Sequence, residues 1–241
     1  MSGSISAALS PNTDGSLPRR SPDAIRYILL RKLASGVRHA MMGELQTLQF
    51  NAELCAQMLQ GGRGGGELAS HLNRLPAQTK AATATCRAAV EWLRPDSNGR
   101  APLGEVFDSC VKLAGDDWML RGVRTCISIA HAERSAVVAK APSSEMIVAS
   151  LLTLVDIRDS LLDIHADASL RGEWVTVRMS AAPPSKRASL TIPPVYARLA
   201  FDDVFALAAE NGVECRCDAA GSSVELRLPS GAPAPAGRDV F

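Results

Sequence analysis

Aromatic residues are scarce in this sequence, and positive and negative charges are nearly balanced. Phe, Trp and Tyr together make up 4% of the 241 residues, and the formal net charge is +1 at pH 7. Stacking platforms for single-stranded nucleic acids need aromatic side chains, and binding to a phosphate backbone needs clustered positive charge. The composition therefore argues against nucleic acid as a partner.

Long apolar runs are also missing. No run approaches the roughly 18 residues of a membrane-spanning helix, and the first residues lack the apolar core of a signal peptide. We therefore expect a cytoplasmic protein with no membrane partner. Apolar residues still make up 46% of the chain, enough to bury a sizeable core in one large or two small domains.

The six cysteines show no paired C-x-x-C spacing. They are Cys55, Cys86, Cys110, Cys126, Cys215 and Cys217. Cys215 and Cys217 are the one close pair, and no histidine accompanies them, so the sequence predicts no metal site. Free, buried or half-buried thiols in a reducing compartment are the expected state.

The first third of the chain predicts two helices after a disordered leader, residues 1–22, rich in Ser, Pro, Gly and Asn. Ser21-Pro22-Asp23 is typical of a helix start, and this helix is expected to run to about Gln60. The glycine cluster Gly61–Gly66 then predicts a hairpin turn. A second helix should follow, with a kink at Pro76.

Apolar residues recur at helical spacing along both predicted helices. The first seam is Leu30, Ala34, Val37, Met41, Leu45, Leu48, Ala52, Cys55 and Leu59, and the second is Leu68, Leu72, Leu75, Thr79, Ala82, Cys86, Ala89 and Leu93. A hairpin with one seam per helix cannot bury both seams alone. We therefore expect residues 23–95 to form a dimeric four-helix bundle.

After a linker, Asp96–Pro102, the pattern changes to that of an α/β domain over residues 101–229, followed by a loose tail, 230–241. Helices are predicted over Leu103–Leu113, from Ser143 to about Ala166, and over Phe201–Glu210. Strands are predicted over Val123–Ile129, Glu173–Ser180, Arg187–Ile192, Val213–Asp218 and Val224–Leu228.

The segment Ala34-Ser-Gly-Val-Arg-His39 resembles the phosphoacceptor box, A-x-G-V-x-H, of bacterial two-component histidine kinases and their relatives, the sporulation-type histidine phosphotransferases. Leu154–Leu161 is similar to the N-box helix of their ATPase domain, and Ala209–Pro229 to its last helix and hairpin. The resemblance implies an α+β chain, in which a dimeric helical hairpin is followed by a degenerate ATPase-like α/β sandwich, with His39 as phosphoacceptor.

Several family residues are missing. Asp156 stands where the N-box has asparagine, and Pro193-Pro194 follows the strand in place of Asp-x-Gly-x-Gly. Ala40 replaces the acid after the histidine, and Gly43 replaces the Thr or Asn that positions water in family phosphatases. These changes predict that the chain neither binds ATP nor acts as autokinase or phosphatase.

The leading hypothesis is a dimeric histidine phosphotransfer protein without a cofactor, which exchanges phosphoryl groups with receiver-domain aspartates on His39. Arg38, Met42, Gly43 and Gln46 would border the docking surface, and the receiver would supply Mg²⁺. A non-catalytic adaptor with a kinase-like fold is the alternative, favoured by Ala40.

A third interpretation is an unrelated α+β enzyme. The pairs Asp156 with Asp159 and Asp163 with Asp167 have helical spacing, but such pairs are typical of solvated helix faces. No catalytic constellation accompanies them.

Overall fold

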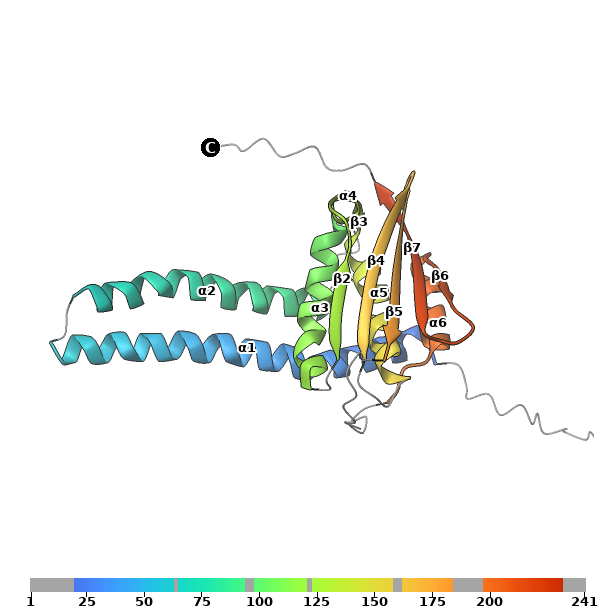
Figure 1. Ribbon diagram of the computed structural model, residues 1–241. Coiled ribbons are helices and arrows are strands. Elements are labelled where there is room, and N and C mark those ends of the chain that lie inside the picture. The colour runs from blue at the N-terminus through green and yellow to red at the C-terminus, as the bar shows by residue number, and fades with distance from the viewer. Residues whose placement is uncertain are drawn as a thin grey trace, which may run out of the picture.

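The computed structural model of the chain describes residues 20–62, 65–93, 98–120, 123–157, 162–183 and 197–231. A long helical hairpin projects from a mixed α/β domain (Figure 1). This order, a helical hairpin followed by an α/β domain, confirms the predicted fold class. Pairing of two hairpins stays a prediction, because it concerns a second chain. Across the described residues, no helix is long and apolar enough to cross a membrane.

The hairpin consists of α1, Pro22–Gln60, and α2, Gly66–Leu93. α1 begins as predicted: the Ser21 hydroxyl accepts a hydrogen bond from the backbone N–H of Ala24, and Pro22 occupies the first turn. It ends at Gly61, whose backbone N–H donates to the carbonyl of Gln57. The glycine cluster therefore closes the hairpin, as far as its described residues show.

Among the described residues, seven strands form one sheet, ordered β1-β3-β7-β5-β4-β2, with β6 also paired to β7. They are β1 Arg100–Pro102, β2 Arg124–Ser128, β3 Val137–Ala139, β4 Asp163–Arg171, β5 Trp174–Ala182, β6 Glu214–Cys217 and β7 Ser223–Gly231. β2 and β4 are parallel, and the other paired strands are antiparallel. Val175, Val177 and Met179 of β5 are fully buried, as their alternation predicted.

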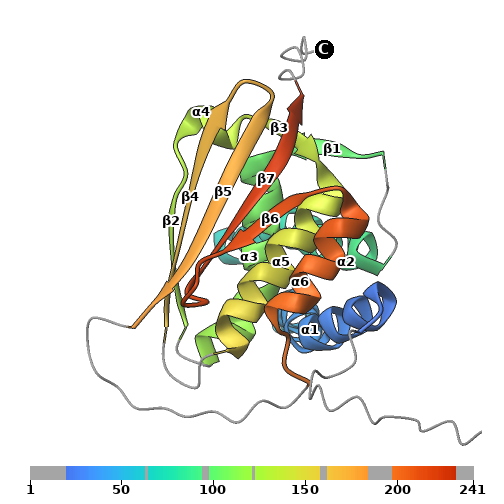
Figure 2. The same cartoon turned by 90° about the vertical axis from the view of Figure 1, so that its right-hand side faces the viewer.

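Three helices cover one face of this sheet: α3 Leu103–Leu120, α5 Lys140–Asp156 and α6 Phe201–Asn211 (Figure 2). A short helix, α4 His131–Arg134, connects β2 to β3. Every residue of α5 from Met146 to Asp156 is buried, so this helix is the centre of the core. α6 ends at Gly212 in the left-handed conformation, as Asn211-Gly212 predicted.

The first half of α1 packs against α3 and α6 rather than only along α2. Ile25, Leu29 and Leu33 belong to the same buried cluster as the α/β domain. The predicted seam is wrong in these turns, because Ala34 is exposed and Leu30 only half-buried. The buried face of α1 is offset by one residue from the predicted seam, because it packs against α3 and α6, which come much later in the chain.

The predicted α5 is wrong at both ends. It begins at Lys140 rather than Ser143, and it ends at Asp156 instead of continuing to Ala166. Residues 163–171 form β4, which pairs with β2 on one side and β5 on the other. Asp163 and Asp167 therefore lie on a strand and not on a helix.

Two smaller boundaries differ from the predictions. α3 continues to Leu120 instead of ending at Leu113, and Arg100–Pro102 of the predicted linker forms β1. The predicted strand Arg187–Ile192 lies outside the described residues, as does the Pro193-Pro194 segment.

At Gly36, the backbones of α1 and α3 approach each other closely. A Cβ atom built at Gly36 would lie 2.7 Å from the carbonyl oxygen of Leu113, which is backbone and cannot turn aside. We expect Gly36→Ala to lower the free energy of unfolding by about 1–3 kcal/mol, because two packed helices must separate. Urea unfolding measures the change.

Gly43→Ala is the matched control, because a Cβ atom at Gly43 meets nothing within 4 Å. In an exposed helix interior, this substitution should stabilise the protein by about 0.5–1 kcal/mol. Equal effects of the two substitutions would contradict the close approach at Gly36.

Candidate functional site

His39 lies in the middle of α1, one turn beyond the contact between Gly36 and α3. Its side chain is exposed. Within the described part of the chain, no hydrogen bond or ion pair engages the imidazole. Ala40, the next residue, is half-buried and offers no acid to the ring. The imidazole is therefore open to a partner molecule.

Met42, Gly43 and Gln46 share one face of α1 with His39. At about 100° per residue, each of the three lies within about 60° of His39 around the helix. All three are exposed, and Gly43 leaves the surface beside the imidazole open. Arg38 is exposed too, but it lies about 100° from His39 and so at the edge of this face.

Phe50 lies on the same face and was missed by the sequence analysis. Its side chain is 61% exposed. The steps from His39 through Gly43 and Gln46 to Phe50 are 4, 3 and 4 residues, which place all four on one side of the helix. The sequence contains this spacing, but Phe50 is three turns from His39 and so lies outside the residues predicted to border it. We call His39, Met42, Gly43, Gln46 and Phe50 the histidine face.

The opposite side of the hairpin is apolar. Its large exposed side chains are Leu45, 44% exposed, and Leu59, 65% exposed, from α1, with Leu72, 45% exposed, and Val90, 60% exposed, from α2. We call these four residues the apolar face.

The four residues of the apolar face lie on one side of the hairpin. In α1, its residues lie about 80° around the axis from Asn51 and Cys55, which are buried against α2. In α2, they lie about 100° from the buried Ala82 and Ala89, in the same rotational sense. Because the helices are antiparallel, both rotations lead to the same side of the hairpin, away from His39.

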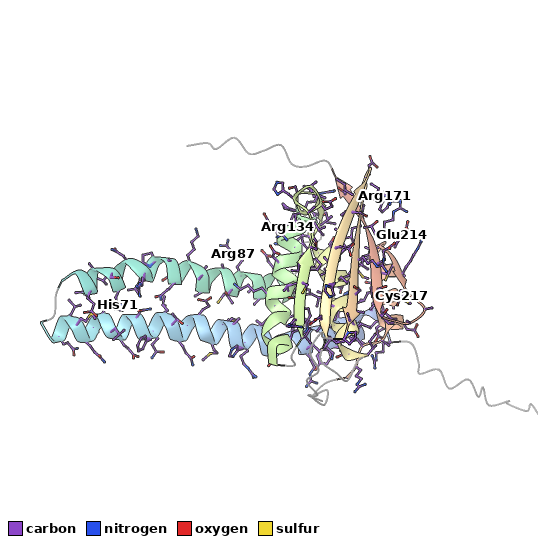
Figure 3. The ribbon with its side chains drawn as sticks, viewed as in Figure 1. His71, Arg87, Arg134, Arg171, Glu214 and Cys217 are labelled. Atoms are coloured by element: carbon purple, nitrogen blue, oxygen red, sulfur yellow. The ribbon has the colours of Figure 1, made fainter. Side chains whose placement is uncertain are left out.

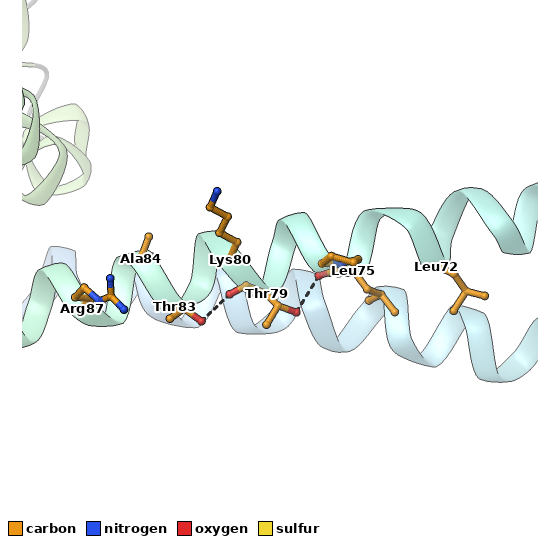
Figure 4. A pocket seen from close by; sticks show the side chains of 8 residues that line it. Leu72, Leu75, Thr79, Lys80, Thr83, Ala84 and Arg87 are labelled. Atoms are coloured by element: carbon orange, nitrogen blue, oxygen red, sulfur yellow. Dashed lines mark hydrogen bonds between the residues drawn. The ribbon is translucent and has the colours of Figure 1, made fainter. Parts of the chain in front are cut away.

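A shallow groove of about 760 Å³ follows α2 on this side (Figure 4). Leu72, Leu75 and Pro76 supply its apolar wall, and Lys80 and Arg87 lie along its edge. The hydroxyls of Thr79 and Thr83 donate to carbonyls one turn earlier in α2, so they offer the groove mostly methyl groups. The groove adds apolar surface next to Leu72.

One polar contact crosses the interior of the hairpin. His71 Nδ1 lies 3.0 Å from Asn51 Oδ1, and Asn51 is 8% exposed. Figure 3 labels His71 in the hairpin. The amide of Asn51 also donates to the carbonyl of Thr47. Asn51 is buried and His71 half-buried, and a polar pair between two helices disfavours sliding of one helix along the other, so we expect this contact to favour one register of the hairpin. His71 is therefore part of the hairpin interior and not of the histidine face.

Asp156, on which the prediction about ATP depends, is buried at the C-terminal end of α5. Lys32 Nζ lies 3.0 Å from its Oδ1 and 2.8 Å from its Oδ2. The backbone N–H of Leu199 donates to Oδ2 at 2.9 Å. The Asp156 carboxylate is therefore held by both an ammonium group and a backbone N–H.

The thiols form no reactive cluster. All six cysteines are free, and burial raises the pKa of Cys110 and of Cys215 to about 12. Cys126 and Cys217 are exposed. Among the described residues, no group of three His, Cys, Asp or Glu side chains is placed to hold a metal ion.

No family model and no curated protein matches the sequence. Solved structures similar to this chain include a bacterial phosphotransferase, with 11% identity over 83% of this chain and 95% of that one, at a TM-score of 0.39. The histidine kinase AdeS of Acinetobacter baumannii has 14% identity over 80% and 98%, also at 0.39. The catalytic domain of the histidine kinase ThkA has 11% identity over 54% and 94%, at 0.41.

Proposed function

We propose that this chain is a histidine phosphotransfer protein that acts as a dimer in the cytoplasm. Phosphoryl groups would pass between receiver-domain aspartates through His39. The observation that carries the proposal is the exposed imidazole of His39 on a face of the hairpin opposite to its apolar face. Dimerisation through the apolar face would leave His39 open to a partner.

The reaction would require only a positioned imidazole from this chain. The lone pair of an imidazole nitrogen would form a bond to phosphorus while the aspartyl O–P bond breaks, and the carboxylate of the receiver would leave with the electron pair. The same step in reverse would pass the group to a second receiver. The receiver would supply Mg²⁺ and its own cation for charge stabilisation, so positioning of His39 is the contribution of this chain.

The histidine face suits a receiver domain as its partner. Phe50 would be the apolar anchor of the docked surface, and Met42 and Gln46 would line the approach to the imidazole. Arg38, at the edge, would meet the negative charge of the phosphoryl group or of the receiver's acidic site.

Direct measurement tests the proposal. The purified chain is mixed with a panel of receiver domains that carry labelled aspartyl phosphate. We expect the chain to acquire acid-labile phosphate within minutes from at least one receiver. Failure with every receiver encoded near the gene would refute the phosphotransfer role.

We further predict that the α/β domain does not bind Mg-ATP. The Asp156 carboxylate is already engaged by Lys32 and the Leu199 N–H, so it is not available to a metal ion. Calorimetric titration with ATP and Mg²⁺ should give no saturable heat. Micromolar binding would show that another set of residues holds nucleotide.

The dimer is tested with the full chain, because Ile25, Leu29 and Leu33 of α1 need the α/β domain to cover them. Sedimentation equilibrium should give a dimer at micromolar concentration. Leu45→Asp, on the apolar face, should weaken the dimer at least 100-fold, because the substitution places charge in a packed interface.

Phe50→Asp is the matched control for the dimer. The same charge is then placed on the histidine face, and the dissociation constant of the dimer should stay within about threefold of the wild-type value, below about 1 kcal/mol. A wild-type monomer, or equal weakening by the two substitutions, would contradict a dimer through the apolar face.

A non-catalytic adaptor is the second candidate, and Ala40 is the observation that favours it. An exposed Phe50 would serve an adaptor as well as a phosphotransfer protein. The two functions differ only in whether His39 takes the phosphoryl group, so the panel of receivers separates them.

A further inference from the structure

Three basic side chains near the start of the described chain bind carboxylates of the α/β domain. Arg20 contacts Asp203 of α6 at 2.8 Å, and Lys32 contacts Asp156 of α5. Between them, Arg26 donates to Glu145 of α5 at 2.7 and 3.2 Å and to Glu210 of α6 at 2.8 Å. The three cations are six residues apart, and every carboxylate on the domain side comes from α5 or α6.

The pair of Lys32 and Asp156 is the innermost of these contacts. The two side chains are 3% and 2% exposed. Water and salt screen such a pair poorly, and separating it would leave two bare charges in the core. Since Asp156 also accepts from the Leu199 N–H, the pair joins α1, the end of α5 and the segment that leads into α6.

The outer contacts are more exposed and involve more groups. Hydrogen bonds to Glu145 and Glu210 raise the pKa of Arg26, so its charge is permanent. The amide of Asn211 also donates to Glu145, which holds that carboxylate in place for Arg26. On the α2 side, Lys140 of α5 forms an ion pair with Glu91.

Shape complements charge at the same contact. Ile25, Leu29 and Leu33 are buried in the core of the α/β domain, and Gly36 lets the backbone of α3 approach α1. A domain that swung away from α1 would expose three large apolar side chains and break the buried pair at once. These costs add to one another on a single face of the helix.

We infer that the first half of α1 is a permanent latch, in which Arg20, Arg26 and Lys32 hold the α/β domain at the base of the hairpin in one orientation. This goes beyond the proposed function and does not depend on the chemistry of His39. His39 follows Lys32 by two turns, about 10 Å along α1. The α/β domain is therefore a fixed neighbour of the histidine face, and a partner at His39 always meets the same arrangement of the two domains.

Distance measurements between the hairpin tip and the α/β domain test the latch. Genetically encoded spin labels at the exposed Gln60 and Glu173 leave the six cysteines untouched, and dilution with unlabelled protein isolates distances within one chain. The wild-type chain should give one narrow distance distribution, unchanged between about 0.1 and 1 M salt, because the innermost pair is buried. A broad or bimodal wild-type distribution would overturn the inference.

Substitution of the latch should release the domain. Lys32→Met should broaden the distribution at least twofold and speed amide hydrogen exchange at Leu29 and Leu33 more than tenfold, while the amides of β5 stay protected. Lys112→Met removes an exposed lysine from α3 and should change neither. Unchanged width and exchange in Lys32→Met would contradict the latch.

If Lys32→Met fails to fold, Arg26→Gln carries the test, because Arg26 is part-exposed. Its distribution should be broader than that of the wild type at about 0.1 M salt, because the contacts of Arg26 with Glu145 and Glu210 are lost. A width equal to that of the wild type in this variant would contradict the latch. All of these readouts are independent of phosphoryl transfer, so they stand or fall separately from the proposed function.

Discussion

His39→Gln is expected to abolish phosphoryl acceptance while the protein stays folded and still binds its receiver. Glutamine keeps a polar side chain that suits a helix but has no nucleophilic nitrogen lone pair. Because the site faces solvent, the free energy of unfolding should change by no more than about 0.5 kcal/mol. Labelled phosphate on the chain, urea unfolding and receiver binding are the three measurements.

His131→Gln and His165→Gln are the controls, because both histidines are exposed and lie in the α/β domain. Transfer should be unaffected in each. His71→Gln should also transfer, although the loss of its contact with Asn51 is expected to loosen the hairpin. Label on His39→Gln would assign the chemistry to another residue.

Lys32→Met should lower the free energy of unfolding by about 3–5 kcal/mol, the largest loss expected from any single substitution in α1. The substitution leaves the Asp156 carboxylate buried without its counter-charge. Asp156→Leu alone should cost a similar amount for the converse reason. Urea unfolding of each variant gives the values.

The double variant Lys32→Met with Asp156→Leu should recover at least half of the loss. Neither buried charge then remains, although the Leu199 N–H loses its acceptor, at about 1–3 kcal/mol. The cycle of four proteins isolates the pairwise term, and Lys112→Met should stay within about 0.5 kcal/mol of wild type. Additive losses in the double variant would show that the two side chains are not coupled.

Local signals in the sequence predicted the ends of several elements correctly. Ser21-Pro22 begins α1, Asn211-Gly212 ends α6, and the alternation of Val175, Val177 and Met179 is that of β5. Each of these features depends on residues within one or two turns of each other. Capping and side-chain alternation are local properties, so a single sequence is sufficient to find them.

The end of α5 could not be found in that way. Apolar residues continue past Asp156, and nothing nearby in the sequence marks the stop. Asp156, the last residue of the helix, is bound by Lys32, 124 residues earlier in the chain. Ile164 and Ala166 then alternate with exposed residues, but a short alternating run also fits a helix until its neighbours β2 and β5 are known.

One part of the candidate site could be predicted from the sequence, and another part could not. His39 and the exposure of its neighbours follow from helical spacing alone, and the structure places Met42, Gly43 and Gln46 beside it. The rotation of the first half of α1 did not follow, because Leu29 and Leu33 pack on a domain that begins about 70 residues later. The predicted seam assumed that α1 packs only against another helix of the bundle. It is therefore wrong where α1 packs against the α/β domain instead.

The central place of β7 bears on how this chain is made. β7 lies between β3 and β5, yet it follows every other described strand in the chain, and Leu29 and Leu33 near the start of the described residues are covered by the domain to which it belongs. At a translation rate of roughly 5–20 residues per second, about 200 residues take some 10–40 s to follow α1 out of the ribosome. During that time the apolar side chains of α1 lack the domain that covers them in the folded protein, so we expect the nascent chain to bind chaperones.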